Sequence, residues 1–237
     1  MNGSPAAAAE GRDEGGRLIR VKVRVRQAVH AAAGPLVRGL VRRGVTPDQL
    51  TVLGCAFSLL AALVFFEGWF RWGAALAAAG GLCDILDGEI ARERGTVSKF
   101  GAFLDSTLDR LGEAAIFAGL AGFYVFSLLD RVRDPAWVLA EIERGQDPRT
   151  WAVVGLTAVL ALVGSVLVSY TRARAEGLGI DCRVGLMERS ERMVLLIVAG
   201  AFGVGPVMPG ALLLVTVLSF TTAAQRVVYV WRSTRDR

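Results

Sequence analysis

Four aspartates stand in stretches that are otherwise apolar. Asp84 and Asp87 lie in the run GAALAAAGGLCDILDGEIA, and Asp105 and Asp109 open a second run that continues to about Leu129. Ionisable side chains at membrane depth are energetically unfavourable, so they usually face an interior cavity, have partners and serve a function. The two aspartate pairs therefore predict a functional site.

The spacing of the aspartates predicts that this site binds metal. Residues three or four apart share one face of a helix, and a connection of this length allows two antiparallel helices with the pairs opposed. Carboxylates brought together repel one another unless a cation neutralises them. Hard divalent cations prefer oxygen ligands, and two ions about 4 Å apart can hold the attacking and leaving oxygens of a phosphoryl transfer. We therefore expect two ions of Mg²⁺ (or Mn²⁺) at Asp84, Asp87, Asp105 and Asp109.

Small residues and an arginine accompany the aspartates. Gly88 and Gly101 allow a ligand or a backbone to approach closely because they have no side chain, and Ala91 is nearly as small. Arg92 can form a bidentate contact with a phosphate group. These residues together predict a site for a phosphorylated ligand. Two other interpretations of the aspartates remain open: partners in buried ion pairs, or the lining of an ion pathway.

Membrane helices are the elements expected to position these residues. The chain has 237 residues, of which 53% are hydrophobic, and its mean hydropathy of +0.46 is too high for an ordinary soluble domain. Six apolar stretches have near-membrane length, at about 50–67, 73–91, 103–129, 151–171, 193–205 and 209–231. The fifth of them is short and flanked by glycine and proline, so five membrane spans are the alternative to six.

Basic residues indicate the orientation of the spans. Arginine and lysine concentrate before the first span, after the second and fourth spans, and at the C-terminus, whereas the loops after spans one and five carry one or none. Since cytoplasmic loops carry the excess of such residues, both termini and the active site should be cytoplasmic in a multi-pass protein of the cell inner (plasma) membrane. Six spans satisfy this pattern and five do not. The basic residues follow the membrane surface, where anionic lipid attracts them, so we expect no nucleic-acid partner.

The residues before the first span divide into two segments. Residues 1–16 have the composition of a disordered tail. Residues 17–48 form a juxtamembrane segment in which RLIRVKVRVR alternates like a strand and LVRGLVRRG reads as an amphipathic helix. A lone strand beside a membrane would leave its backbone unpaired, so we favour an interfacial amphipathic helix. Residues 49–237 are then one all-α integral membrane domain.

The complete aspartate pattern is more specific than its parts. It reads Asp84-x-x-Asp87-Gly88-x-x-Ala91-Arg92, then eight residues to Gly101, three to Asp105 and three to Asp109. This resembles the signature of the CDP-alcohol phosphotransferase family at every defined position. The lead-in TPDQLT is similar to the family's TPN-x-x-T, with Asp48 in place of the asparagine.

The resemblance implies a fold and a role for each residue of the pattern. The fold would be six transmembrane helices around a polar cavity open to the cytoplasm, in a homodimer. Asp84, Asp87 and Asp105 would be metal ligands, and Asp109 would be both a ligand and the catalytic base for the incoming alcohol. The cytidine and diphosphate of a CDP-linked lipid would be bound by Gly88, Ala91, Arg92 and Gly101.

A second group of residues, after the fourth span, bears on the acceptor alcohol. A cluster of arginines suits a doubly charged phosphate, and a basic membrane flank without a ligand is the alternative. SYTRARAEGLG is similar to the SY-x-KARAEGLG stretch of bacterial phosphatidylinositol phosphate synthases, and GLMERSERM to their G-x-x-ERPER segment, with Ser190 replacing proline. On that resemblance, the phosphate of inositol phosphate would be surrounded by Ser169, Arg172, Arg174, Arg189 and Arg192.

These observations predict an enzyme of phospholipid biosynthesis, a metal-dependent phosphatidyltransferase. It would transfer the phosphatidyl group from CDP-diacylglycerol to inositol phosphate and release CMP. Glycerol 3-phosphate, the acceptor of phosphatidylglycerophosphate synthases, is the alternative acceptor. Some members of the family instead transfer a phospho-alcohol to diacylglycerol, and a cation transporter or channel is the alternative from a different class.

Overall fold

The structure is a computed structural model that describes residues 34–144 and 147–235. Over these residues the chain is helical and contains no strand, which confirms the all-α prediction. The predicted tail (1–16) and the first part of the predicted juxtamembrane segment (17–33) lie outside the described residues. Residues 34–42 are helical, and their Val37 packs with Leu50 and Ile90.

Helices occupy all six predicted apolar stretches. An additional short helix, α5, forms within the loop where the sequence predicts no element. In chain order the helices are α2 (Pro47–Phe66), α3 (Phe70–Arg94), α4 (Lys99–Arg131), α5 (Pro135–Glu143), α6 (Arg149–Glu176), α7 (Arg189–Ala201) and α8 (Val207–Arg235).

Four of these helices, α2, α4, α6 and α8, are long and apolar enough to cross a membrane, so the chain is an integral membrane protein. Helix α7 has 13 residues, a length of about 20 Å, against a hydrocarbon core of about 30 Å. Helix α3 has 25 residues, but its second half carries Asp84, Asp87 and several other charged side chains. Six spans therefore stay a prediction.

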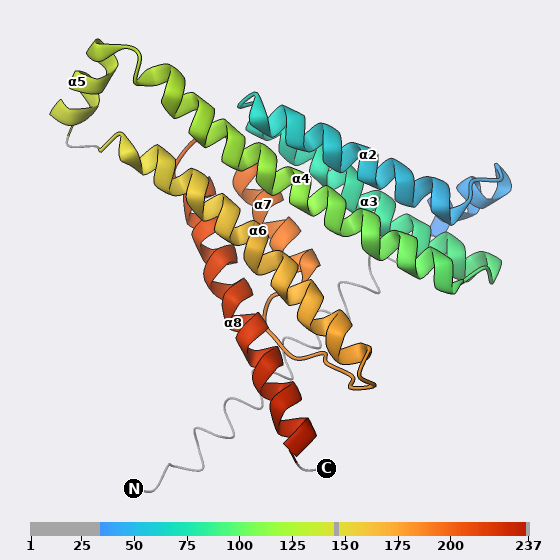
Figure 1. Cartoon of the computed structure of the whole chain (residues 1–237). Helices are drawn as coiled ribbons and strands as arrows, with labels where there is room; N and C mark the ends of the chain where they lie inside the picture. The colour runs from blue at the N-terminus through green and yellow to red at the C-terminus, as the bar shows by residue number, and fades with distance from the viewer. Residues whose placement is uncertain (1–33, 145–146, 236–237) are drawn as a thin grey trace, which may run out of the picture.

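The helices form two groups that meet towards the end that carries α5 and diverge from there (Figure 1). In the first group α2 packs against both α3 and α4, and in the second α6 packs against α8. Helices α4 and α6 lie side by side and connect the groups, while α7 packs against α3 and α8. Helices α3 and α4 both pack on α2 and make far fewer contacts with each other. Polar side chains can therefore occupy the space between them.

Glycines bring the helices of the first group close together. A methyl group added at Gly54 of α2 would lie 3.2 Å from the Gly80 carbonyl oxygen, and one added at Gly80 of α3 would lie 3.0 Å from the Gly54 carbonyl oxygen. A methyl group at Gly119 of α4 would lie only 2.2 Å from the carbonyl oxygen of Ala62. Small residues are the usual means by which membrane helices approach this closely. They hold α3 and α4 on neighbouring sides of α2.

A short turn makes α3 and α4 antiparallel, as the sequence predicts. Helix α3 ends at Gly95, whose φ of 63° is left-handed, a conformation that glycine adopts without strain. Three residues later Ser98 caps α4, its Oγ accepting a 2.9 Å hydrogen bond from the Gly101 amide. This turn places the last turns of α3 beside the first turns of α4.

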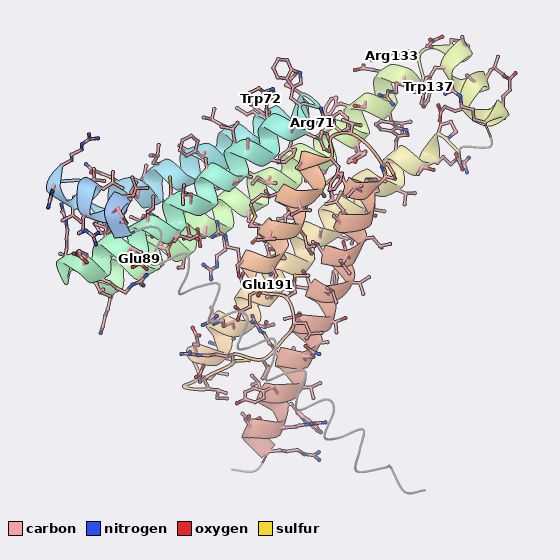
Figure 2. The ribbon with its side chains drawn as sticks, turned by 180° about the vertical axis from the view of Figure 1, so that it is seen from behind. Arg71, Trp72, Glu89, Arg133, Trp137 and Glu191 are labelled. Atoms are coloured by element: carbon pink, nitrogen blue, oxygen red, sulfur yellow. The ribbon has the colours of Figure 1, made fainter. Side chains whose placement is uncertain are left out.

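Aromatic residues gather at the opposite end of the molecule. Phe70 contacts Phe65 and Phe123 edge to face, with ring centroids 5.5 and 4.9 Å apart. Figure 2 places Arg71, Trp72, Arg133 and Trp137 towards this end, and Glu89 and Glu191 away from it. Trp72 is 64% exposed, as expected for a tryptophan at a membrane–water interface.

Candidate active site

The aspartates of α3 and α4 converge on one pocket. One carboxylate oxygen from each of Asp84, Asp105 and Asp109 lies within 4.8 Å of the other two. Asp87 lines the same pocket and accepts a 2.6 Å hydrogen bond from Thr51 Oγ1 of α2. The four residues that the sequence predicts as metal ligands are thus brought together.

Small and polar residues from four helices form the wall of this pocket. Helix α2 supplies four of the lining residues, and the first residue of α7 completes the wall. The lining residues are Thr51, Gly54, Cys55, Ser58, Gly80, Asp84, Asp87, Asp105, Leu108, Asp109 and Arg189.

Arg189 is the cation that the structure places among the carboxylates. Its Nη1 lies 2.7 Å from Asp109 Oδ2 and 3.1 Å from Asp84 Oδ2, so one guanidinium bridges α4 and α3. The sequence predicts Arg189 as a ligand of the acceptor phosphate, and says nothing of its contact with the aspartates. The structure therefore joins the predicted metal site and the predicted acceptor site through one side chain.

The donor set of the pocket fits a divalent cation. Four carboxylates face a single arginine, which leaves an excess of negative charge that further cations would neutralise. Asp105 Oδ1 is buried and has no hydrogen-bond partner among the described residues, and a buried polar atom of this kind calls for a ligand or an ion. All the charged donors are carboxylate oxygens, the ligands that Mg²⁺ and related hard cations prefer.

The residues predicted to bind the CDP group continue from the aspartates towards the turn between α3 and α4. The Arg92 guanidinium folds back along the helix, so that a methyl group at Gly88 would lie 3.4 Å from its Nη2. Arg92 is half-exposed and forms an ion pair with Glu89. A methyl group at Gly101 would lie 3.1 Å from Ser98 Oγ, so this glycine also serves the cap of α4. Ala91 is partly exposed on the same end of α3.

The residues predicted to bind the acceptor phosphate lie on two helix ends. Ser169, Arg172 and Arg174 are in the last turns of α6, and Arg189 begins α7. Arg172 Nε donates a 2.9 Å hydrogen bond to Glu176 Oε1, and Arg174 is exposed. Arg172 and Arg174 therefore remain accessible to a ligand, whereas Arg189 is mostly buried among the carboxylates.

Arg192 has a different environment from the other predicted arginines. Its side chain is fully buried, and its Nε and Nη2 donate hydrogen bonds of 2.6 and 3.0 Å to the two carboxylate oxygens of Glu113 on α4. Its Nη1 donates to the Met187 carbonyl oxygen at 3.3 Å. The structure does not bring Arg192 to the aspartate pocket, and a direct phosphate contact would require this ion pair to open.

Glu113 is a residue of this region that the sequence analysis missed. It follows Asp109 by four residues on α4, so the two carboxylates share a face. The sequence pattern could have indicated it, because Glu113 is a third acidic residue on the same face of an apolar helix as Asp105 and Asp109. Its partner could not be identified, since Arg192 lies 79 residues away in the sequence.

Comparison with known proteins identifies relatives over most of the chain. A synthase of Streptomyces avermitilis named phosphatidylinositol phosphate synthase is 38% identical over 85% of this chain and 79% of its own length. The archaetidylinositol phosphate synthase of Methanothermobacter thermautotrophicus is 34% identical, covering 82% of this chain and 92% of that protein.

Solved structures show the same fold. The Mycobacterium tuberculosis phosphatidylinositol phosphate synthase with CDP-DAG bound superimposes with a TM-score of 0.69 at 34% identity, over 83% of this chain and 92% of that one. The same enzyme in complex with manganese and citrate gives a TM-score of 0.67 at 33% identity, over 83% and 88% of the two chains. Residues 44–223 match the family model described as CDP-alcohol phosphatidyltransferase. Those residues include the aspartates, the turn between α3 and α4 and the arginines after α6, and the chain belongs to the CDP-alcohol phosphatidyltransferase family.

Proposed function

We propose that this protein transfers the phosphatidyl group of CDP-diacylglycerol to inositol phosphate, forming phosphatidylinositol phosphate and CMP. One observation carries the proposal: Arg189, from the segment that resembles the acceptor site, contacts Asp84 and Asp109 of the aspartate pocket. A phosphorylated acceptor held by Arg189 would therefore have its hydroxyl close to the carboxylates. The names of the relatives, which are inositol phosphate synthases, support the same acceptor.

The carboxylates are proposed to bind Mg²⁺ or Mn²⁺, and the manganese complex of the mycobacterial relative supports a divalent metal. Two ions held by Asp84, Asp87, Asp105 and Asp109 suit the number of carboxylates in the pocket. When bound, such ions would neutralise the charge that develops on the phosphoryl oxygens.

The residues of the chain would position the donor and the acceptor. We propose that Gly88, Ala91, Arg92 and Gly101 bind the CDP group, and the CDP-DAG complex of the mycobacterial relative supports the donor. Arg92, whose guanidinium lies over Gly88, would exchange its contact with Glu89 for the diphosphate. Ser169, Arg172, Arg174 and Arg189 would bind the acceptor phosphate, and Arg192 would act on this site by fixing the position of α7.

Asp109 is proposed as the base that receives the proton of the acceptor hydroxyl. The hydroxyl oxygen attacks the phosphorus next to the diacylglycerol group, the bond from that phosphorus to the CMP oxygen breaks, and CMP leaves. Phosphoryl transfer of this kind depends on positioning and electrostatics more than on covalent catalysis. The contact of Asp109 with Arg189, a proposed ligand of the acceptor phosphate, supports this role.

The orientation in the membrane is also proposed. We infer six spans, α2, α3, α4, α6, α7 and α8, around a polar cavity that is open to the cytoplasm, in the inner membrane and as a homodimer. The basic residues near the aspartate end support this orientation. Residues 34–42 would lie along the cytoplasmic surface of the membrane.

The proposal is tested by measuring CMP release from CDP-diacylglycerol by the purified protein with Mg²⁺ and a panel of acceptors. Inositol phosphate should support turnover, whereas unphosphorylated inositol and serine should not. Turnover with glycerol 3-phosphate alone would replace the proposed acceptor with that alcohol. CMP release with inositol or serine would contradict the role of the phosphate-binding arginines.

A further inference from the structure

We propose that Arg226 of α8 is a positioning residue for the acceptor site, because it ties α8 to both segments that carry the proposed phosphate-binding arginines. The inference rests on the proposed function, since it concerns the same acceptor. Arg226 lies far in the sequence from the aspartates and from the arginines that resemble the family's acceptor segment.

The contacts of Arg226 reach two separate parts of the chain. Its Nε donates a 2.9 Å hydrogen bond to the Val184 carbonyl oxygen, in the loop that joins α6 to α7. Its Nη1 donates to the Val168 carbonyl oxygen of α6. Val168 precedes Ser169 and lies one turn before Arg172, and Val184 precedes Arg189 by five residues. One guanidinium therefore holds both sides of the proposed acceptor site.

A second residue of α8 supports the same loop. Thr222 lies one turn before Arg226 on the same face, and its Oγ1 accepts a 3.1 Å hydrogen bond from the Met187 amide. The loop approaches Thr222 so closely that a methyl group at Gly185 would lie 2.3 Å from its Cγ2. Gly185 also has a φ of 122°, a backbone conformation that favours glycine. The loop is thus fitted to α8 immediately before α7 begins.

These contacts continue without interruption to the aspartate pocket. The Met187 carbonyl oxygen accepts a hydrogen bond from Arg192, the partner of Glu113 on α4. Two residues after Met187, Arg189 reaches Asp84 and Asp109. The position of the Arg189 guanidinium is therefore set from α8 through the loop, and from α4 through Arg192.

Burial of Arg226 indicates that this arrangement is more than incidental packing. The residue is 2% exposed, and both contacts above are to backbone carbonyl oxygens rather than to a carboxylate. A buried arginine is unfavourable unless its donors are satisfied. An apolar residue at this position of the helix could be buried without that cost of desolvating a charge. A planar fork of donors can bridge two carbonyl oxygens on separate segments, which the ammonium of lysine does less well.

The order of the loop is measured through Cys182, a thiol with 0% exposure in the segment between α6 and α7. The holoprotein in detergent is treated with a maleimide, and peptide mass spectrometry follows labelling of Cys182, with the buried Cys83 of α3 as the internal control. Arg226→Met should speed the labelling of Cys182 by about tenfold, the sign of local opening. Labelling of Cys83 should not change.

The effect on the acceptor site is measured by steady-state CMP release with inositol phosphate and CDP-diacylglycerol. Arg226→Met should raise the KM for inositol phosphate about tenfold and leave the KM for CDP-diacylglycerol within about twofold, since only acceptor contacts are displaced. Arg226→Lys should restore part of the affinity, and Thr222→Val should shift both readouts in the same direction by less. Arg232→Gln, an exposed arginine six residues further along α8, is the matched control and should behave as wild type.

A wild-type rate of Cys182 labelling together with a wild-type acceptor KM in Arg226→Met would overturn the proposal. An equal rise in both KM values would also overturn it, because it would indicate general destabilisation. If Arg226→Met does not fold, Arg226→Lys and Thr222→Val decide by the same two readouts. A wild-type protein that does not use inositol phosphate would contradict the proposed function, while Cys182 labelling would still decide whether Arg226 holds the loop.

Discussion

Replacing Arg192 with methionine should destabilise the protein because Glu113 would keep a buried charge without its partner. The side chains of Arg192 and Glu113 are 0% and 2% exposed, and two hydrogen bonds join them. Removal of one partner from such a pair costs about 3–5 kcal/mol, since the remaining charge is uncompensated. For a chain of this size, 1 kcal/mol corresponds to about 2–4 °C in melting temperature, so we expect a decrease of about 6–20 °C.

The matched double variant separates the ion pair from the packing around it. Arg192→Met combined with Glu113→Leu removes both charges, and replacement of a buried pair by apolar residues is often neutral in stability. Its melting temperature should therefore recover most of the loss. Arg133 and Asp130 form an exposed pair of 79% and 74% exposure, so Arg133→Met is the control and should change stability by less than about 1 kcal/mol.

Thermal unfolding in detergent, followed by intrinsic tryptophan fluorescence, gives these melting temperatures, and CMP release gives the KM for inositol phosphate. A wild-type melting temperature for Arg192→Met, combined with a raised KM for inositol phosphate alone, would refute the reasoning. Arg192 would then be a phosphate ligand, as the sequence predicts. A loss of stability that the double variant restores would show that Arg192 acts on the site through the position of α7.

Three further predictions concern the metal, the arginine in the pocket and the helix packing. Chelation by EDTA should abolish CMP release and lower the melting temperature, and Mg²⁺ or Mn²⁺ should restore both, because a ligand that binds only the folded state stabilises it; activity in EDTA would contradict the metal site. Arg189→Gln should tighten Mn²⁺ binding about tenfold in calorimetry, because it removes a cation that competes for the carboxylates, while raising the KM for inositol phosphate; weaker Mn²⁺ binding would oppose this view. Gly119→Ala should lower the free energy of unfolding by about 1–3 kcal/mol because its methyl would meet the Ala62 carbonyl oxygen, whereas Gly81→Ala, which faces open space, should be neutral; equal melting temperatures would contradict the close packing.

Features that depend on local sequence could be predicted. The spacing of Asp84 and Asp87, and of Asp105 and Asp109, determines which face of each helix they share, and the structure brings all four to one pocket. The apolar stretches likewise predicted six of the helices, although each begins and ends up to a few residues away from the expected bounds, and they did not predict α5. Gly95 and Ser98 explain the turn that opposes the two aspartate pairs.

Features that depend on contacts distant in the sequence could not be predicted. Arg189 meets Asp84 across 105 residues, and no local pattern shows that the acceptor segment reaches the aspartates. The same holds for Arg192 with Glu113, and for Arg226, whose carbonyl partners lie 42 and 58 residues away. In the sequence, the arginines after α6 form one basic cluster whose members cannot be told apart. The structure separates them into accessible side chains, a buried ion pair and a bridge to the carboxylates.

The central claim is that the converging aspartates form the catalytic centre, and CMP release by Asp105→Asn tests it most directly. Asp105 is chosen because its Oδ1 is buried without a hydrogen-bond partner among the described residues, so its role depends on what binds there. Asparagine preserves the shape of the side chain and removes its charge. We expect the variant to keep the melting temperature of the metal-free wild type and to release no CMP from CDP-diacylglycerol. Retained turnover in a folded Asp105→Asn protein would contradict the account.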